Sequence, residues 1–249
     1  MKKTKLLIFL ILGTLNTFGQ NAKNDSLQTK KNIEFKFEAL IIPTVLIGYG
    51  IVGLESHTLD FIDTNTRDEI IENIENKLTI DDFSQYSPFL SVYGLNGIGI
   101  KGKNNFKDRT IILGTAYLIM GGTVNIVKGT GNVERPDGSS KNSFPSGHTA
   151  TAFMGAEFLY QEYKDVSIWY GVTGYVVATG TGLFRMYNNR HWLTDVAAGA
   201  GIGILSTKIA YWIHPLIKKT IFKDKENMNG IVMPFYNGRE YGLGLSMTF

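Results

Sequence analysis

The stretch NSFPSGHTATAF, residues 142–153, decides how this chain is interpreted, because a polar turn changes there into an apolar run. Ser146 is a suitable N-cap for a helix that starts at Gly147, and the glycine lets the backbone approach a ligand closely. The free N–H groups at such a helix start favour an anion. His148 stands in the same turn and is therefore a candidate proton donor.

Two further polar segments interrupt apolar stretches, KGTGNVERP at 128–136 and RMYNNRHWLTD at 185–195. They supply three cations, Lys128, Arg135 and Arg185. Gathering cations is costly unless an anion neutralises them. The fork of an arginine suits a tetrahedral oxyanion. The three segments together therefore predict a phosphate-binding site.

His191 and Asp195 are four residues apart, one helical turn, so the carboxylate can hydrogen-bond one ring nitrogen. That bond fixes the tautomer and leaves the other nitrogen as a nucleophile. His148 has no acid beside it in the sequence and suits protonation of a leaving oxygen. The G-x-S-x-G elbow of serine hydrolases is missing around Ser146, which argues against that class.

Composition excludes several functions. The 249 residues contain no cysteine, so disulfides, zinc–thiolate sites and thiol catalysis are excluded. The net charge of +3 equals the three lysines of residues 1–19, a segment without acids. No basic stripe with interleaved aromatic residues is present, and we expect no nucleic-acid partner.

The chain divides by composition into four parts. Residues 1–19 have the charged and apolar regions of a signal peptide, which predicts export to the periplasm or cell envelope. Residues 20–38 form a polar linker, 39–213 a helical domain, and 214–249 a basic segment with a C-terminal hairpin. The fold expected is all-α, a bundle of about six core helices. The apolar stretches that predict them are 39–54, 86–100, 109–127, 149–160, 167–183 and 196–213.

Several local patterns refine this expectation. Gly199 and Gly203, four residues apart, predict a close helix contact. The acidic segment 55–85 has isoleucines and a leucine at helical spacing (Ile70, Ile71, Ile74, Leu78), which predicts a short amphipathic helix across the bundle. His214 precedes Pro215 and is expected to end the last helix.

The C-terminal residues have a different pattern. Asn237-Gly238 lies between two apolar runs, and apolar and small or polar residues alternate from Tyr241 to Phe249. This combination predicts a short β-hairpin.

The three polar segments resemble the pattern of the phosphatidic acid phosphatase type 2 and vanadium haloperoxidase superfamily. That pattern is Lys, six residues, Arg-Pro; then Pro-Ser-Gly-His; then Ser-Arg, five residues, His, three residues, Asp. Here it runs from Lys128 to Asp195 with every spacing kept. The resemblance covers roughly residues 86–213. Phe184 stands where the family usually has the serine before the arginine, so one phosphate-contacting hydroxyl is missing.

The resemblance implies an all-α bundle and metal-independent hydrolysis of phosphomonoesters, with no cofactor. It implies that His191 attacks phosphorus to form a phosphohistidine, that Asp195 holds His191, and that His148 protonates the departing alcohol. The phosphoryl oxygens would be bound by Lys128, Arg135, Ser146, Gly147 and Arg185.

The expected substrate is a lipid phosphate or a small phosphate ester, and the expected partner is a membrane surface or bilayer. Integral and peripheral association both remain open. Two alternative functions are considered. The same residues would hold vanadate in a vanadate-dependent haloperoxidase, with His191 as its ligand. A site weakened by Phe184 would suit a non-enzymatic envelope protein that binds anionic lipid.

Overall fold

The helices expected from the apolar stretches are present in the computed structural model. It describes residues 37–71, 79–221, 229–236 and 241–248. The expected signal peptide, 1–19, and the linker up to residue 36 lie outside the described residues. Within the described ranges the helices are α2 (Glu38–Gly53), α3 (His57–Ile71), α4 (Ile80–Ser84), α5 (Ser87–Gly97), α6 (Phe106–Thr130), α7 (Gly147–Tyr163), α8 (Ile168–Tyr187) and α9 (Leu193–Ile221).

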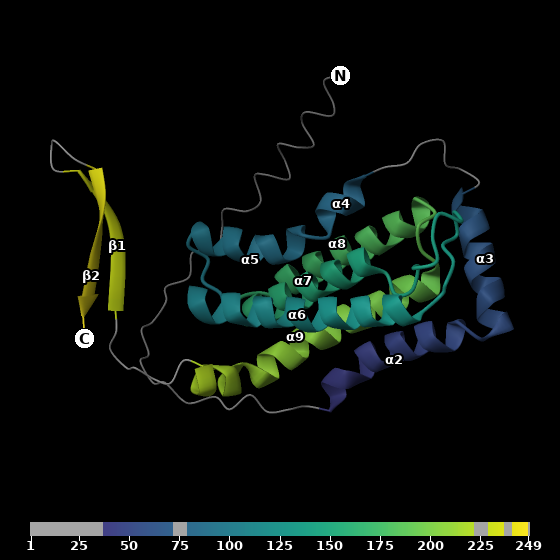
Figure 1. The fold of residues 1–249 in the computed structure, drawn as a ribbon, viewed down its shortest axis with the longest axis horizontal. Coiled ribbons are helices and arrows are strands. Elements are labelled where there is room, and N and C mark those ends of the chain that lie inside the picture. The colour runs from purple at the N-terminus through teal and green to yellow at the C-terminus, as the bar shows by residue number, and fades with distance from the viewer. Residues whose placement is uncertain (1–36, 72–78, 222–228, 237–240, 249) are drawn as a thin grey trace, which may run out of the picture. The chain divides into compact units, whose positions relative to one another are not determined.

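Helix α7 lies at the centre of the bundle. It contacts α5, α6, α8 and α9, and α2 packs on the outside of α9 (Figure 1). The six apolar stretches correspond to α2, α5, α6, α7, α8 and α9. The prediction of an α-helical bundle with about six core helices is confirmed, and α3 and α4 are added to it.

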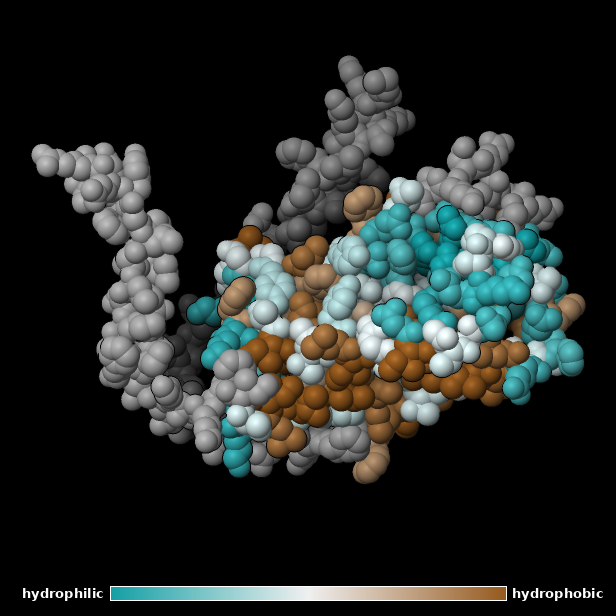
Figure 2. All heavy atoms as spheres, viewed as in Figure 1, coloured by the Kyte–Doolittle hydropathy of each residue, from teal (hydrophilic) through white to brown (hydrophobic). Residues whose placement is uncertain are grey.

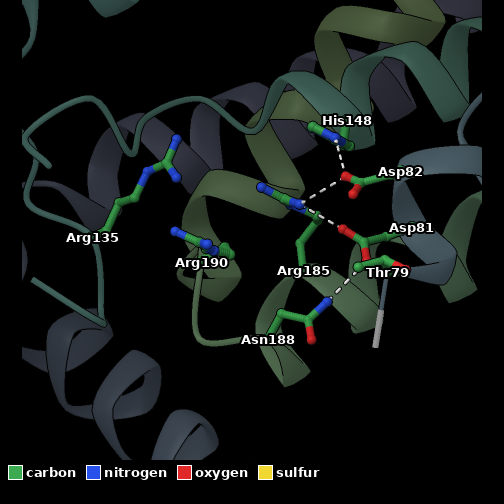
Figure 3. A pocket seen from close by; sticks show the side chains of 8 residues that line it. All are labelled: Thr79, Asp81, Asp82, Arg135, His148, Arg185, Asn188 and Arg190. Atoms are coloured by element: carbon green, nitrogen blue, oxygen red, sulfur yellow. Dashed lines mark hydrogen bonds and ion pairs between the residues drawn. The ribbon is translucent and has the colours of Figure 1, made fainter. Parts of the chain in front are cut away.

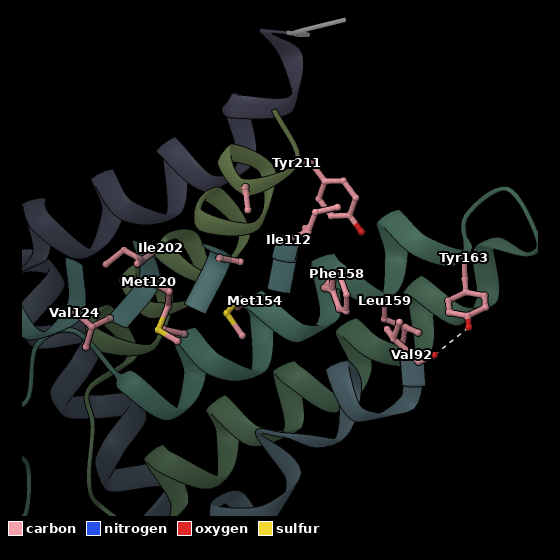
Figure 4. Close-up of a cluster of buried hydrophobic side chains, with 13 residues drawn as sticks. Val92, Ile112, Met120, Val124, Met154, Phe158, Leu159, Tyr163, Ile202 and Tyr211 are labelled. Atoms are coloured by element: carbon pink, nitrogen blue, oxygen red, sulfur yellow. Dashed lines mark hydrogen bonds between the residues drawn. The ribbon is translucent and has the colours of Figure 1, made fainter. Parts of the chain in front are cut away.

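The largest core cluster lies where α5, α6, α7 and α9 meet (Figure 4). Ile112 and Met120 of α6 pack there with Met154 and Phe158 of α7 and Ile202 of α9, all of them buried. Truncation of one such aromatic side chain to alanine costs about 3–5 kcal/mol. This cluster therefore fixes the helices whose ends carry the polar segments.

Two glycines let α9 approach α7 closely. A Cβ at Gly199 would lie 2.5 Å from the carbonyl oxygen of Ser146, and a Cβ at Gly203 would overlap the carbonyl oxygen of Ala150. A side chain at either position would force the helices apart. The predicted close contact is confirmed, and it holds the start of α7 against the first turns of α9.

Helix α3 confirms the sequence expectation in part. A helix is present over His57–Ile71 and contacts α2, α8 and α9, whereas Ile74 and Leu78 lie outside the described residues. Ile70 of the expected apolar face is half-buried, and the side chains of Ile71, Ile74 and Leu78 lie outside the described residues, so this face stays a prediction. Asp63 is buried in the described part of the helix. The start of α9 offers N–H groups that require an acceptor, and Asp63 supplies it.

The last helix continues past Pro215, so the boundary expected at His214 is wrong. α9 runs to Ile221 with Pro215 inside it. A proline removes one helical hydrogen bond, but side chains on both sides of it contact Asp108 in the first turn of α6. His214 Nε2 lies 3.4 Å and Lys218 Nζ 3.3 Å from the Asp108 carboxylate oxygens. These contacts hold the extension against α6.

The C-terminal part contains two strands, β1 (Asn229–Tyr236) and β2 (Tyr241–Thr248). They pair antiparallel, from Asn229 opposite Thr248 to Tyr236 opposite Tyr241. The expected turn at Asn237-Gly238 lies outside the described residues, and the hairpin turn stays a prediction.

Apolar residues form a band along the helices, and hydrophilic residues gather at the end of the helical body where α3 and the 131–146 segment lie (Figure 2). Two described helices are long and apolar enough to cross a membrane, over Phe106–Thr130 and Leu193–Thr220. Helices α2 and α3, bent by 96° at their junction, would make a third crossing if they act as one. Leu118 and Ile126 of α6 and Val176 of α8 are among the exposed apolar side chains.

Candidate active site

The PSGH turn begins α7, as expected. Ser146 is the N-cap, and its Oγ accepts a hydrogen bond from the Thr149 N–H at 3.4 Å. The Ser146 N–H donates to the carbonyl oxygen of Asp195 at 3.0 Å, which joins the starts of α7 and α9. A Cβ at Gly147 would meet Val124 only at 3.8 Å, an ordinary contact distance. Packing with described neighbours therefore does not require glycine at position 147.

The predicted pair of His191 and Asp195 is present and buried. His191 Nδ1 lies 3.3 Å from Asp195 Oδ2. The same oxygen accepts hydrogen bonds from Ser143 Oγ at 2.5 Å and from the Trp192 N–H at 2.9 Å. Asp195 lies in the first turn of α9, so the carboxylate also satisfies an N–H at the start of that helix. Sequence spacing gave no indication of the Ser143 contact.

Burial keeps His191 neutral. Desolvation lowers its pKa to about 4, although the hydrogen bond and negative charge of Asp195 act in the opposite direction. The positive charges of Arg185 and Lys128 lower it further. An imidazole with its Nδ1 held by a carboxylate and a pKa well below 7 presents Nε2 as an unprotonated nucleophile at neutral pH.

Helix α3 braces the segment between α8 and α9 that carries His191. Asp63 accepts from the Thr194 N–H at 3.2 Å and from the Thr194 hydroxyl at 2.5 Å. Arg67 Nε donates to Asn189 Oδ1 at 3.1 Å, and its guanidinium carbon lies 6.0 Å from the centre of the Trp192 ring. Sequence analysis missed these contacts because the partners are more than a hundred residues apart.

A polar cavity of about 370 Å³ lies beside these residues (Figure 3). Three of the predicted site residues line it, Arg135, His148 and Arg185, and His191, Asp195, Lys128, Ser146 and Gly147 are not among its lining residues. The pair of His191 and Asp195 is thus buried next to the turn, while His148 faces the cavity. The remaining lining residues are Thr79, Asp81, Asp82, Asn188 and Arg190.

Two carboxylates from α4 enter this cavity, which sequence analysis did not predict. Asp81 accepts from Arg185 Nη1 at 2.5 Å and from Asn188 Nδ2 at 2.9 Å. Asp82 Oδ1 lies 3.0 Å from His148 Nε2. The inference that His148 has no acid partner is therefore wrong, because Asp82, remote in sequence, is brought to it by the fold.

The lysine at the site has a hydrogen-bond partner, whereas two of the arginines each have a side-chain nitrogen without one among the described residues. Lys128 Nζ donates to the carbonyl oxygen of Asn142 at 2.5 Å. The Nε atoms of Arg135 and Arg185 are buried without a hydrogen-bond partner among the described residues. Burial lowers the pKa of Arg135, and the nearby charges of Arg185 and Arg190 lower it further. Buried, unpaired donors on mutually repelling cations make this a site that an oxyanion would stabilise.

Phe184, at the position of the family serine, packs on Tyr187. The two ring centres are 6.0 Å apart with the planes at 70°, an edge-to-face contact. Position 184 therefore contributes a ring contact within α8 and offers no hydroxyl.

Part of the chain is similar to known proteins. The PAP2 superfamily matches residues 109–219. The chain is 44% identical over 153 residues to the lipid A 1-phosphatase of Porphyromonas gingivalis. This matched region covers 60% of this chain and 33% of that protein. It is 35% identical over 74 residues to the bacitracin transport permease protein BcrC of Bacillus licheniformis, covering 30% and 34%. The chain thus spans about a third of the length of these curated relatives.

Among solved structures, the chain is similar to LpxE of Aquifex aeolicus, with a TM-score of 0.47 and 23% identity over 60% of this chain and 94% of that one. The PAP2 match covers the three polar segments with their spacing, and the structure places them on a helical bundle. The helical core of this chain is thus similar to the PAP2 superfamily over residues 109–219.

Proposed function

We propose that this protein is a metal-independent phosphatase that hydrolyses a lipid phosphate monoester through a phosphohistidine intermediate. The observation that carries the proposal is the buried pair of His191 and Asp195, in which Nδ1 is held and the ring is neutral. A neutral imidazole beside cations with unpaired donors is suited to attack on phosphorus.

The reaction has two steps. In the first, His191 Nε2 forms a bond to phosphorus while the bond from phosphorus to the ester oxygen breaks, and His148 gives its proton to the departing oxygen. In the second, water attacks the phosphohistidine, the N–P bond breaks, and His148 takes a proton from the water. Inorganic phosphate leaves, and both histidines return to their starting states.

The transferring phosphoryl group would be held by the predicted ligands. The buried Nε–H groups of Arg135 and Arg185 supply donors, and Lys128 supplies positive charge. The Ser146 hydroxyl and the Gly147 amide lie at the start of α7, where N–H groups attract an anion. Asp81 binds Arg185 through Nη1, which orients the guanidinium and leaves its Nε available.

An apolar pocket of about 430 Å³ between α2, α6 and α9 supports a lipid substrate. Ile51 lines it from α2 and Val127 from α6, and Phe144 lines it next to Ser143, which bonds Asp195. A hydrocarbon chain lying there would end close to the buried histidine. The 44% identity to a protein named lipid A 1-phosphatase supports the same substrate class.

The distribution of lysines supports a site on the periplasmic side of a membrane. Lys128 is in the last turn of α6 and Asp195 in the first turn of α9, at the site. Lys107 lies at the opposite end of α6, and Lys218 and Lys219 at the opposite end of α9. Positively charged loops stay on the cytoplasmic side. A chain with α6 and α9 in the bilayer would then present the site outside.

The test uses the purified full chain, in detergent, with p-nitrophenyl phosphate and a panel of long-chain lipid phosphates. Wild-type protein should release inorganic phosphate without added metal, and His191→Ala should reduce release to background while the protein stays folded, as shown by a cooperative thermal unfolding transition. Radiolabelled substrate should leave an acid-labile phosphate on wild-type protein only. Bromide oxidation that depends on vanadate, without phosphate release, would favour the haloperoxidase function instead.

A further inference from the structure

His148 has a hydrogen-bonded carboxylate of its own. Its Nε2 lies 3.0 Å from Asp82 Oδ1, and the two side chains point toward each other in the lining of the cavity (Figure 3). Asp82 belongs to α4, outside the residues 109–219 matched by the family. The pair is half-exposed, unlike the buried pair of His191 and Asp195.

The position of Asp82 is fixed by contacts on both sides of it. Asp81 binds Arg185 at 2.5 Å, and Ser84 Oγ lies 2.7 Å from Thr181 Oγ1, so α4 is attached to α8 at two points. The Gln85 side chain donates to the carbonyl oxygen of Asp82 at 2.9 Å. A five-residue helix held in this way presents its second carboxylate to His148 in a set geometry.

We propose that Asp82 is a positioning residue that orients His148 and keeps it charged, so that His148 can protonate the leaving oxygen of the substrate. This inference rests on the proposed phosphatase function. With Nε2–H donating to Asp82, the other ring nitrogen, Nδ1, is the atom that gives its proton to the ester oxygen as the P–O bond breaks. The imidazole is then neutral, and Nδ1 accepts a proton from water in the second step.

The surrounding charges explain why such a partner is needed. Arg185 of α8 faces His148, and Arg135 and Arg190 line the same cavity. Burial and the charge of Arg185 lower the pKa of His148, which discourages the protonated form that a general acid requires. Asp82 and, more weakly, Asp81 act in the opposite direction. Removal of the Asp82 charge would leave Asp81 as the one carboxylate that opposes the effect of Arg185 on His148.

Asp82→Asn tests the proposal with two substrates of different leaving group. Dodecyl phosphate has a poor leaving group that needs protonation, and p-nitrophenyl phosphate has a good one. We expect kcat on dodecyl phosphate to fall about 10- to 100-fold, the range for one hydrogen bond to a charged group. On p-nitrophenyl phosphate kcat should change less than about twofold. The basic limb of the pH profile of kcat/KM should move to lower pH, and Asp82→Glu should restore part of the loss.

Two further variants make the result specific. In the His148→Ala background, Asp82→Asn should cause no further loss on dodecyl phosphate, because the two residues act as a unit. Asp165→Asn removes an exposed carboxylate at the turn between α7 and α8 and should leave both activities unchanged.

Each outcome has one meaning. Equal losses of Asp82→Asn on the two substrates, an unmoved pH profile, or a full additional loss in the His148→Ala background would overturn the positioning role. In those cases wild-type turnover would still support the phosphatase function. If wild-type protein released phosphate from neither substrate, the phosphatase function and this inference would both be overturned.

Discussion

Asp63 on α3 accepts both the backbone N–H and the hydroxyl of Thr194, the residue directly before Asp195. A carboxylate from one helix thus caps the start of another, and the capped turn carries the acid that holds His191. The geometry of the buried histidine therefore depends on a contact between α3 and α9.

Asp63→Ala should reduce both stability and activity. The substitution leaves two buried donors of Thr194 without an acceptor, which costs about 1–3 kcal/mol. Thermal unfolding and kcat should both decrease, because the turn with Asp195 loses its support. Asp60→Ala, an exposed carboxylate on the same helix, is the matched control and should change neither. Normal activity in a destabilised Asp63→Ala protein would mean that the cap does not position His191.

The pH dependence of stability should report the burial of His191. Its pKa is about 4 in the folded protein and about 6.5 when unfolded, so between these values the unfolded chain binds the extra proton. Stability should therefore be complete above about pH 6.5 and fall as the pH decreases toward 4. The loss should not exceed about 3–4 kcal/mol. Thermal unfolding of wild type and His191→Gln across this range checks the assignment, since the variant should lack this component.

The pH dependence of turnover should have two limbs. Activity should fall below about pH 4, where His191 takes up a proton, and should decrease on the basic side as His148 loses its proton. The pKa of His148 is lowered from 6.5 by burial and by Arg185, so the optimum should be acidic. A profile of kcat/KM that rises steadily to pH 9 would contradict the assignment of His148 as the acid.

Ser143→Ala tests the hydroxyl that donates to Asp195 Oδ2 at 2.5 Å. Loss of this hydrogen bond should lower kcat about fivefold, the equivalent of roughly 1 kcal/mol, with KM nearly unchanged. Steady-state kinetics with p-nitrophenyl phosphate measure both parameters. A large rise in KM at constant kcat would indicate that Ser143 contacts substrate and does not act through Asp195.

Gly199→Ala should separate α9 from α7, because the added Cβ would lie 2.5 Å from the Ser146 carbonyl oxygen. We expect a loss of about 1–3 kcal/mol and reduced activity, since Ser146 begins the helix that carries His148. Gly180→Ala in α8 meets nothing within 4 Å and should instead stabilise the helix by about 0.5–1 kcal/mol. The opposite signs of the two changes in melting temperature form the test.

Ile51→Trp should partly fill the apolar pocket between α2, α6 and α9. If the pocket binds a hydrocarbon chain, kcat/KM for long-chain lipid phosphates should fall about tenfold, while turnover of p-nitrophenyl phosphate should change far less. Ile41→Trp, at an exposed position of α2 that does not line the pocket, serves as the control. Equal behaviour of the two variants would place the lipid chain elsewhere.

The features that sequence predicted are those that depend on neighbours along the chain. Apolar stretches identified the six core helices, and the spacing of four identified the contacts of Gly199 and of His191 with Asp195. Periodicity within one helix or turn determines these relationships.

The features that sequence missed depend on tertiary contacts. Asp82 lies 66 residues before His148, and Asp63 lies 131 residues before Thr194. In the sequence both belong to an acidic segment that is typical of a solvated helix face. The helix past Pro215 was missed for the same reason, because Asp108, which contacts it, is on another helix.

Helix α4 is five residues long, precedes the region shared with the family, and supplies the carboxylates that face Arg185 and His148. Replacements in this helix would therefore change the surroundings of the proposed proton donor without altering the three segments that carry the family spacing. If His148 acts as proposed, we expect enzymes that share those segments to differ in the alcohols they release when this one short helix differs, and comparison of α4 would sort them into substrate groups.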